Sequence, residues 1–370
     1  MRYLCFVMLS SLICCNTAET EKDIVPGPVE PEQTIREIVN EVFPEGNVFI
    51  GAACHHRLFG TKSFDILNRE FSYVTPANDF KQSYIHPEPG KYRFEQSDDW
   101  VQMCENHKQV IRMHAPISPQ CSKWVKEDSR TAQELQTILE EYMFALCSKY
   151  NGISNILWLD VVNETIDKTT GDWFGPKEGT DKWENPWPKI GFDETHALRP
   201  PLYIKQAFTI ANEYAPDIKQ IINQHGALEE ASWDKMKALV AYLRENKLRV
   251  DGLGWQAHID LGWEKIPGNI ERLGEIVRWC HSNDLEFHIT EFNVWLKDGD
   301  EYKFEEQAAT FKETTKAVLD NRSNGTVGIN FWHIRADDTQ NKDWDGCLFN
   351  DAYEPKRAYF EIRNLLKSYK

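Results

Sequence analysis

Four short apolar runs of this chain end on polar side chains that can work together in acid–base chemistry. Asn163 and Glu164 follow LDVV, Asn223 ends QIIN, His258 closes GWQAH, and Glu291 closes HITE. Polar residues often end a strand for structural reasons alone. Four such ends of similar character in one chain favour a common site instead.

Two carboxyl groups on opposite walls of a site can hydrolyse a glycosidic bond with retention of configuration. The two groups then lie about 5–5.5 Å apart; one attacks the anomeric carbon, and the other protonates the leaving oxygen and later activates water. Their surroundings must separate their pKa values. Glu164 and Glu291 are the candidates for this pair. Asn163 is suited to bind a sugar 2-hydroxyl, and Gln256 and His258, two residues apart on one strand, could orient Glu291.

Eight β-rich apolar runs must position these side chains. The expected strands are Val48–Ala53, Phe71–Thr75, Gln109–His114, Ile156–Val162, Lys219–Asn223, Gly252–Gln256, Glu286–Thr290 and Val327–Trp332. Amphipathic helices are expected over Thr131–Tyr150, Leu202–Tyr214, Ser232–Asn246, Asn269–Asn283, Tyr302–Asn321 and Tyr353–Leu366. Near-continuous apolar strands that alternate with helices indicate a parallel sheet. Eight repeats predict a single α/β domain closed as a (β/α)8 TIM barrel, whose catalytic residues stand at the C-terminal strand ends.

The chain begins with a pattern typical of an export signal. Met1 and Arg2 precede an apolar run over residues 3–13 that is too short to span a bilayer. Cys14 and Cys15 fit a lipid-attachment site, and ordinary cleavage near Ala18 fits equally well. We therefore expect a signal peptide over 1–18, a charged and proline-rich flexible linker over 19–33, and one catalytic domain over 34–370. The protein is expected to be secreted or held at the cell surface, with or without a lipid anchor.

Composition excludes some partners. The formal net charge is −16, which argues against nucleic acid and against an anionic membrane surface, because both require a basic footprint. The cysteines that follow the signal are scattered without the spacing of a zinc site, and their disulfide pairing cannot be read from the sequence. We expect no metal and no cofactor, and a monomer. The 13 tryptophans suit sugar stacking, but on composition alone a tryptophan-rich core explains them better.

Several motifs together resemble a known family. They are GAA (51–53), VTPANDFK (74–81), YRFEQSDDWV (92–101), RMH (112–114), DVVNE (160–164), QAH (256–258), ITE (289–291) and LFNDAYEPKRAY (348–359). Over residues 45–366 the chain is similar to family 10 glycoside hydrolases, which are mainly endo-β-1,4-xylanases. The resemblance implies a retaining, endo-acting enzyme on a β-1,4-linked polysaccharide, with xylan as the default substrate. A different or decorated β-glycan, or a non-catalytic glycan-binding barrel, are the alternatives.

The resemblance also implies individual roles. Glu164 would be the acid/base and Glu291 the nucleophile, with Asn163 on the 2-hydroxyl and His258 on the nucleophile. The positions expected to bind the glycone sugars, by this resemblance, are Asn78, Lys81 and His114, walled by Trp332 and Trp344.

The chain departs from the family pattern around the glycone. Ala77 stands where a glutamate is usual, Gln82 replaces a tryptophan, and residues 115–119 replace T-L-x-W-H. Asn293 replaces the acidic residue two after the nucleophile, and the N-D-Y after the fifth strand reads Asn223-Gln224-His225. These changes spare both glutamates, so they put the identity of the substrate in doubt more than the reaction type.

A long segment over residues 171–189 follows the fourth strand. It carries Trp173, Phe174, Trp183 and Trp187. These rings could stack on sugars at the leaving-group side of the cleft, or they could pack the loop against the barrel. Both interpretations are open, and Trp263 and Trp295 have the same ambiguity.

Overall fold

The computed structural model describes residues 33–179, 183–297, 300, 302–339 and 344–370. The predicted signal peptide and all of the predicted linker except Gln33 lie outside these residues. From Gln33 to Lys370 the chain forms one compact unit.

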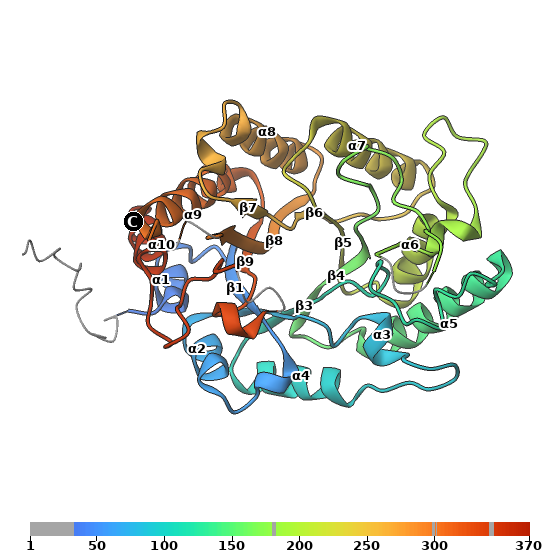
Figure 1. Ribbon diagram of the computed structural model, residues 1–370, viewed down its shortest axis with the longest axis horizontal. Helices are drawn as coiled ribbons and strands as arrows, with labels where there is room; N and C mark the ends of the chain where they lie inside the picture. The colour runs from blue at the N-terminus through green and yellow to red at the C-terminus, as the bar shows by residue number, and fades with distance from the viewer. Residues whose placement is uncertain (1–32, 180–182, 298–299, 301, 340–343) are drawn as a thin grey trace, which may run out of the picture. The chain divides into compact units, whose positions relative to one another are not determined.

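A closed parallel barrel lies at the centre of this unit (Figure 1). Its strands are β1 (Val48–Cys54), β2 (Tyr73–Pro76), β3 (Val110–Met113), β4 (Ile156–Asn163), β5 (Lys219–Gln224), β6 (Gly252–Trp255), β8 (Glu286–Trp295) and β9 (Val327–Phe331). They pair in the order β6-β5-β4-β3-β2-β1-β9-β8, and a further pairing of β6 with β8 closes the ring. All eight expected runs are strands, so the predicted (β/α)8 barrel is confirmed. A short extra strand, β7 (His258–Asp260), pairs with the end of β8.

Helices surround the strands (Figure 1). They are α1 (Ile35–Val42), α2 (Lys62–Glu70), α3 (Gln82–Ile85), α4 (Glu95–Asn106), α5 (Ala132–Tyr150), α6 (Leu202–Tyr214), α7 (Glu230–Glu245), α8 (Asn269–Ser282), α9 (Phe304–Leu319) and α10 (Arg357–Lys367). Short 3-10 turns are η1 (His56–Leu58), η2 (Trp187–Ile190), η3 (Trp263–Lys265), η4 (Arg322–Asn324) and η5 (Ala336–Asp338). Thr131 caps α5 in a capping box with Glu134, which explains why this predicted helix begins one residue later than expected.

The core has two parts. Most buried apolar side chains lie between the strands and the helices, whereas Tyr73, Trp158 and Ile221 form a small separate cluster. Nearer the C-terminal strand ends, Arg112 and Asp160 form a fully buried ion pair. Arg112 also donates to the carbonyl of Thr290 at 2.7 Å. The polar residues of the site therefore stand on a rigid, packed barrel.

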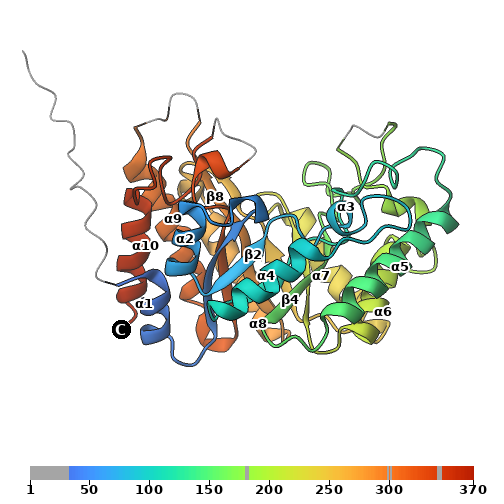
Figure 2. The same cartoon turned by 90° about the horizontal axis from the view of Figure 1, so that it is seen from below.

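The two ends of the folded unit are joined through one buried carboxylate. Glu70 accepts hydrogen bonds from the backbone N–H of Ile35 at 3.0 Å and from the Tyr359 hydroxyl at 2.9 Å. Figure 2 shows α1 beside α10, the helices that carry these partners. The same view shows the longer connections gathered along its upper side.

Candidate active site

A cleft of about 850 Å³ lies at the C-terminal ends of the barrel strands. The predicted site residues that line it are Asn78, Lys81, His114, Asn163, Glu164, Gln256, His258, Glu291, Trp332 and Trp344. The two remaining ones, Asn223 and Asn293, are fully buried and hydrogen-bond to lining residues. The structure therefore brings all of the predicted site residues together.

Glu164 leaves the end of β4 in a left-handed backbone conformation, with φ 57°. Such a conformation is unfavourable for a residue with a Cβ atom, and functional sites often retain it. The Glu164 N–H donates to the carbonyl of Asn223 at 3.0 Å, which fixes the turn against β5. The carboxylate Oε1 accepts from Gln256 Nε2 at 2.9 Å and from Asn163 Nδ2 at 3.2 Å. The other oxygen, Oε2, lies 3.7 Å from His225 Nδ1.

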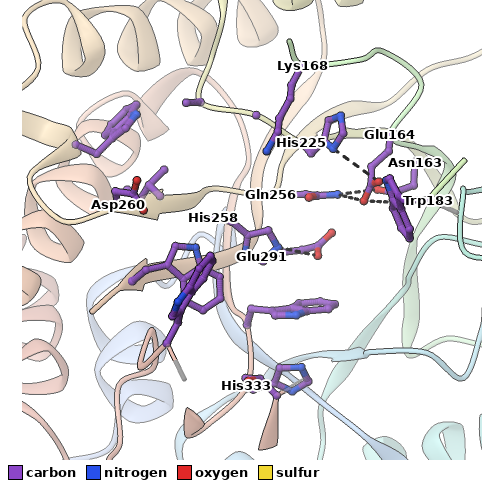
Figure 3. Close-up of a pocket in the computed structure, with 18 of the residues that line it drawn as sticks. Asn163, Glu164, Lys168, Trp183, His225, Gln256, His258, Asp260, Glu291 and His333 are labelled. Atoms are coloured by element: carbon purple, nitrogen blue, oxygen red, sulfur yellow. Dashed lines mark hydrogen bonds and ion pairs between the residues drawn. The ribbon is translucent and has the colours of Figure 1, made fainter. Parts of the chain in front are cut away.

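Glu291 stands within β8 and is 5% exposed. Its Oε1 accepts from Asn223 Nδ2 at 3.0 Å and lies 3.8 Å from His114 Nε2. Its Oε2 lies 3.3 Å from His258 Nε2 (Figure 3). Burial raises the pKa of Glu291, but His114, the hydrogen bond and charge of His258, and Arg112 outweigh it and hold this pKa well below its usual range. Glu291 is therefore ionised at neutral pH, as a nucleophile must be.

Three amide side chains connect the two glutamates. Asn223 Nδ2 donates to Asn163 Oδ1 at 2.9 Å as well as to Glu291, and its own Oδ1 accepts from Thr290 Oγ1 at 2.7 Å. Gln256 Nε2 lies 3.2 Å from the same Asn163 oxygen. Each carboxylate is thus held by donors that are themselves fixed by other hydrogen bonds.

The expectation that Gln256 and His258 both orient Glu291 is correct only for His258. Gln256 contacts Glu164 and Asn163 instead. The reason is Ala257, whose φ of 57° ends β6 before β7 begins. The two side chains therefore do not lie on one continuous strand, and they point to different carboxylates (Figure 3).

Asn293 determines the tautomer of His258. Asn293 Nδ2 donates to the carbonyls of Trp332 at 3.1 Å and Gly346 at 3.0 Å, so its Oδ1 must face the histidine. This oxygen lies 3.0 Å from His258 Nδ1, which therefore carries a proton. His258 Nε2 then attracts the Glu291 carboxylate only when the imidazole is doubly protonated.

The expected glycone contacts are built around Lys81. Its ammonium donates to Asn78 Oδ1 at 2.9 Å and also to Gln120 Oε1. Burial lowers the pKa of Lys81 to about 8, although the carboxylates of the site partly oppose this. His114 is held by Asp160, with Nδ1 2.9 Å from Oδ2.

Gln82, one of the departures from the family pattern, has a structural role. It is fully buried, donates to the carbonyl of His86 at 2.8 Å and accepts from the N–H of Ser122 at 2.7 Å. It therefore fixes the segment after β3 and takes no position in the cleft wall.

The aromatic residues of the segment after β4 have different roles. Phe174 and Trp187 are buried, and Trp187 Nε1 donates to the carbonyl of Ser118 at 3.1 Å, so these rings pack the segment against the barrel. Trp173 also packs against the core. Trp183 differs, because it lines the cleft and is 44% exposed.

Trp263 and Trp295 both line the cleft although they are largely buried. Trp295 stacks on His258 with a centroid distance of 5.7 Å, so it supports the nucleophile's partner. Trp344 packs edge-on against Trp295 and is 39% exposed.

Sequence reasoning missed several lining residues, namely His55, Gln120, His225 and His333. His225 follows Asn223 at the end of β5, and this neighbouring position could have indicated it. His333 likewise directly follows the expected strand Val327–Trp332, whereas Gln120 lies in an irregular segment whose course no periodicity predicts. Within the described parts of the chain, no group of three or more His, Cys, Asp or Glu side chains could hold a metal ion. No helix among the same residues is long and apolar enough to cross a membrane.

Comparisons with known proteins agree with this geometry. Residues 38–365 match the model of glycosyl hydrolase family 10. The chain is 28% identical over 342 residues to Endo-1,4-beta-xylanase B of Thermotoga neapolitana, covering 87% of this chain and 89% of that protein. It is 26% identical over 369 residues to the longer Endo-1,4-beta-xylanase A of Thermotoga maritima, covering 94% of this chain and 32% of that protein. A solved structure, xylanase 10B from Thermotoga petrophila RKU-1 in complex with xylobiose, has 26% identity and a TM-score of 0.74, covering 91% of this chain and 98% of that one. Because the family model spans nearly the whole described barrel, this chain belongs to glycosyl hydrolase family 10.

Proposed function

We propose that this family 10 enzyme is a retaining endo-β-1,4-xylanase with Glu291 as nucleophile and Glu164 as acid/base. The observation that carries the proposal is the unequal environment of the two glutamates at one cleft. Glu291 is held ionised by two histidines and Arg112, whereas Glu164 accepts from the neutral amides of Gln256 and Asn163. Separate environments for two carboxyl groups are what a retaining mechanism needs.

The reaction follows from this placement. Glu291 attacks the anomeric carbon while Glu164 gives its proton to the leaving oxygen, so the glycosidic bond breaks and a glycosyl ester forms on Glu291. Glu164, now a carboxylate, takes a proton from water as that water attacks the anomeric carbon. The ester bond breaks, and the product keeps the β configuration. Asn163 donates to Glu164 and accepts from Asn223, the donor to Glu291, and it lines the cleft, where its side chain would meet the 2-hydroxyl of the reacting sugar.

Two further observations favour xylan. The relatives compared above are named endo-1,4-beta-xylanases, and the similar solved structure holds xylobiose. The open cleft is lined by Trp183, Trp332 and Trp344, rings of the kind that stack on sugars.

The test compares Glu291→Gln and Glu164→Ala with the wild type on linear xylo-oligosaccharides, with Glu275→Gln as an exposed control on α8. We expect Glu291→Gln to lose turnover. With an aryl xylobioside whose leaving group needs no proton, Glu164→Ala should still form the glycosyl-enzyme, and azide should then release a β-glycosyl azide. The first product of the wild type, followed by NMR, should be the β anomer. An α first product, or wild-type turnover by Glu291→Gln, would refute the mechanism.

The proposal includes export and a monomeric state. Either residues 1–18 would be removed by cleavage near Ala18, or cleavage just before Cys14 or Cys15 would leave that cysteine as the lipid-bearing N-terminus; in both cases residues 19–33 would tether the barrel. Mass spectrometry of the mature N-terminus distinguishes lipid attachment from simple cleavage near Ala18. Light scattering measures the oligomeric state.

A further inference from the structure

One end of the cleft, formed by the loops after β1, β2, β3 and β9, is lined by basic and neutral polar side chains. His55, Lys81 and His333 line it together with Asn78 and Gln120, and we call these five residues the basic end. Lys81 is almost fully buried, and both acceptors of its ammonium are neutral amides. Among the described residues, no carboxylate lies within salt-bridge distance of it. A buried ammonium without a paired carboxylate is costly, and a bound anion would relieve this cost.

The hydrogen bonds of the basic end determine which groups are free to donate. Lys81 can only donate, so Asn78 Oδ1 must face it and Asn78 Nδ2 must point away. Asn78 Nδ2 lies 3.2 Å from His55 Nδ1 and donates to it. The proton of a neutral His55 is therefore on Nε2, and no described residue accepts it. His55 thus has a free donor at the cleft.

His333 supports this arrangement at a conformational cost. Its φ is 74°, a left-handed conformation that favours glycine, yet the residue is a histidine that is only 3% exposed. Its ring stacks on that of His55, with centroids 4.6 Å apart and an angle of 25° between the planes. Its Nδ1 is buried and has no hydrogen-bond partner in the described residues. Figure 3 shows His333 on the wall of the pocket that holds Glu291.

The electrostatics at this end favour an anion. Burial, with smaller contributions from the charges of Arg57 and Lys81, lowers the pKa of His55 to about 4. Burial also lowers the pKa of His333, again with contributions from His55, Arg57 and Lys81. Burial is the larger cause of both shifts, and the smaller contributions of Arg57 and Lys81 come from positive charge near this end of the cleft, in a chain whose net charge is −16. The chemistry of the basic end is thus that of a carboxylate site.

We propose that the basic end binds the carboxylate of a uronic acid borne by the polysaccharide, with Lys81 Nζ and His55 Nε2 as donors and His333 holding the His55 ring. The preferred substrate class is then an acidic, uronic-acid-substituted xylan. This inference rests on the proposed function and adds a specificity to it.

The test uses a matched pair of substrates. One is a xylo-oligosaccharide with a single uronic-acid branch; the other is the same compound after reduction of the carboxyl group to an alcohol. Size and shape are kept and only the charge is removed. For the wild type we expect kcat/KM to be at least about tenfold higher on the acidic compound than on the neutral one, because one charge-assisted hydrogen bond contributes about this factor. In high salt, kcat/KM on the acidic compound should fall towards the value for the neutral compound.

Variants then locate the carboxylate. His55→Phe keeps a ring and removes the donor, and His333→Gly suits the left-handed backbone and removes the stacked ring; both should bring the acidic-to-neutral ratio close to one. Lys168→Met removes a positive charge from the other side of the same cleft and should keep the wild-type ratio. Thermal unfolding checks the fold of each variant. If His333→Gly does not fold, His333→Asn is used in its place, because asparagine also tolerates the left-handed backbone.

The outcomes separate this inference from the proposed function. Equal cleavage of both compounds by the wild type would refute the acidic specificity and leave the xylanase assignment intact. Loss of the ratio in Lys168→Met, with the ratio kept in the histidine variants, would place the carboxylate elsewhere and overturn the proposal. No cleavage of either compound or of linear xylo-oligosaccharides would refute the proposed function itself.

Discussion

Replacing Asn293 by aspartate should destabilise this protein, although it restores the acidic residue usual at this position in similar sequences. The side chain is fully buried, and its Nδ2 donates to two backbone carbonyls, those of Trp332 and Gly346. An aspartate has no such donor, so both carbonyls would lose their partner and face a carboxylate oxygen. Only the contact with His258 Nδ1 would strengthen, because a charged acceptor replaces a neutral one.

The size of the effect follows from these contacts. An ordinary buried hydrogen bond contributes about 1 kcal/mol, and leaving a buried group unsatisfied costs about 1–3 kcal/mol. Two carbonyls lose their donor and one hydrogen bond gains strength. We therefore expect the free energy of unfolding to fall by roughly 2–4 kcal/mol at neutral pH. The loss should shrink as the pH falls and the new side chain takes up a proton, because a protonated carboxyl can donate to one carbonyl again.

Urea unfolding of wild type and Asn293→Asp at pH 7 and pH 4.5 measures this difference. Asn106→Asp is the matched control, since Asn106 is exposed at the end of α4 and its side-chain oxygen acts only as an acceptor, from Gln102. The control should change stability by less than about 0.5 kcal/mol. A variant as stable as the wild type at pH 7 would show that the orientation assigned to Asn293, and with it the tautomer of His258, is wrong.

Two further substitutions test the groups around the nucleophile. His258→Gln removes a hydrogen bond and a charge that lower the pKa of Glu291, so this pKa should rise. The acid limb of the pH profile of kcat/KM should then move to higher pH by roughly 1–2 units. An unmoved limb would mean that His114 and Arg112 alone keep Glu291 ionised. Gly254→Ala places a Cβ atom 2.6 Å from Asn223 Oδ1 and 2.7 Å from Thr290 Cγ2, which displaces the donor to Glu291. We expect kcat to fall about 100-fold in this variant. The control Gly175→Ala should keep wild-type activity, because its Cβ would meet only Trp173 O at 3.9 Å. Similar activity in both variants would contradict a positioning role for Asn223.

The barrel could be predicted from the sequence because its signals are local. Strands such as β4 and β9 are buried along nearly their whole length and read as near-continuous apolar runs. Helices α1, α2, α3 and α4 were not predicted. Of these, α3 has four residues, and α4 has Phe94 at its N-cap without a side-chain cap hydrogen bond, so the usual start signals are absent.

The site residues on strands or at strand ends could be predicted from the sequence. Those whose position depends on the backbone conformation of the connections between strands were harder to predict. Glu164 and His258 lie at or beside strand ends, Glu291 lies within β8 where its pairing register with β9 shifts, and all three were identified. The partner of Gln256 was missed because Ala257 takes a left-handed conformation, which alanine rarely adopts and a sequence pattern does not indicate. His333 directly follows the expected strand Val327–Trp332, but the sequence pattern does not indicate the left-handed conformation, with φ 74°, that it takes there.

The barrel distinguishes its two glutamates by the charges that it brings to each of them. Glu291 on β8 has His258 of β7, His114 after β3 and Arg112 of β3 as neighbours, so three cationic or protonatable groups from two strands and their ends favour its ionised form. Glu164 after β4 meets two neutral amides and one histidine at 3.7 Å. The neighbours of each glutamate are fixed by strands that pair in one order only. In the proposed mechanism the roles of nucleophile and acid/base thus follow from barrel topology, whereas the proposed acidic specificity rests on His55 and His333, which lie in the loops after β1 and β9.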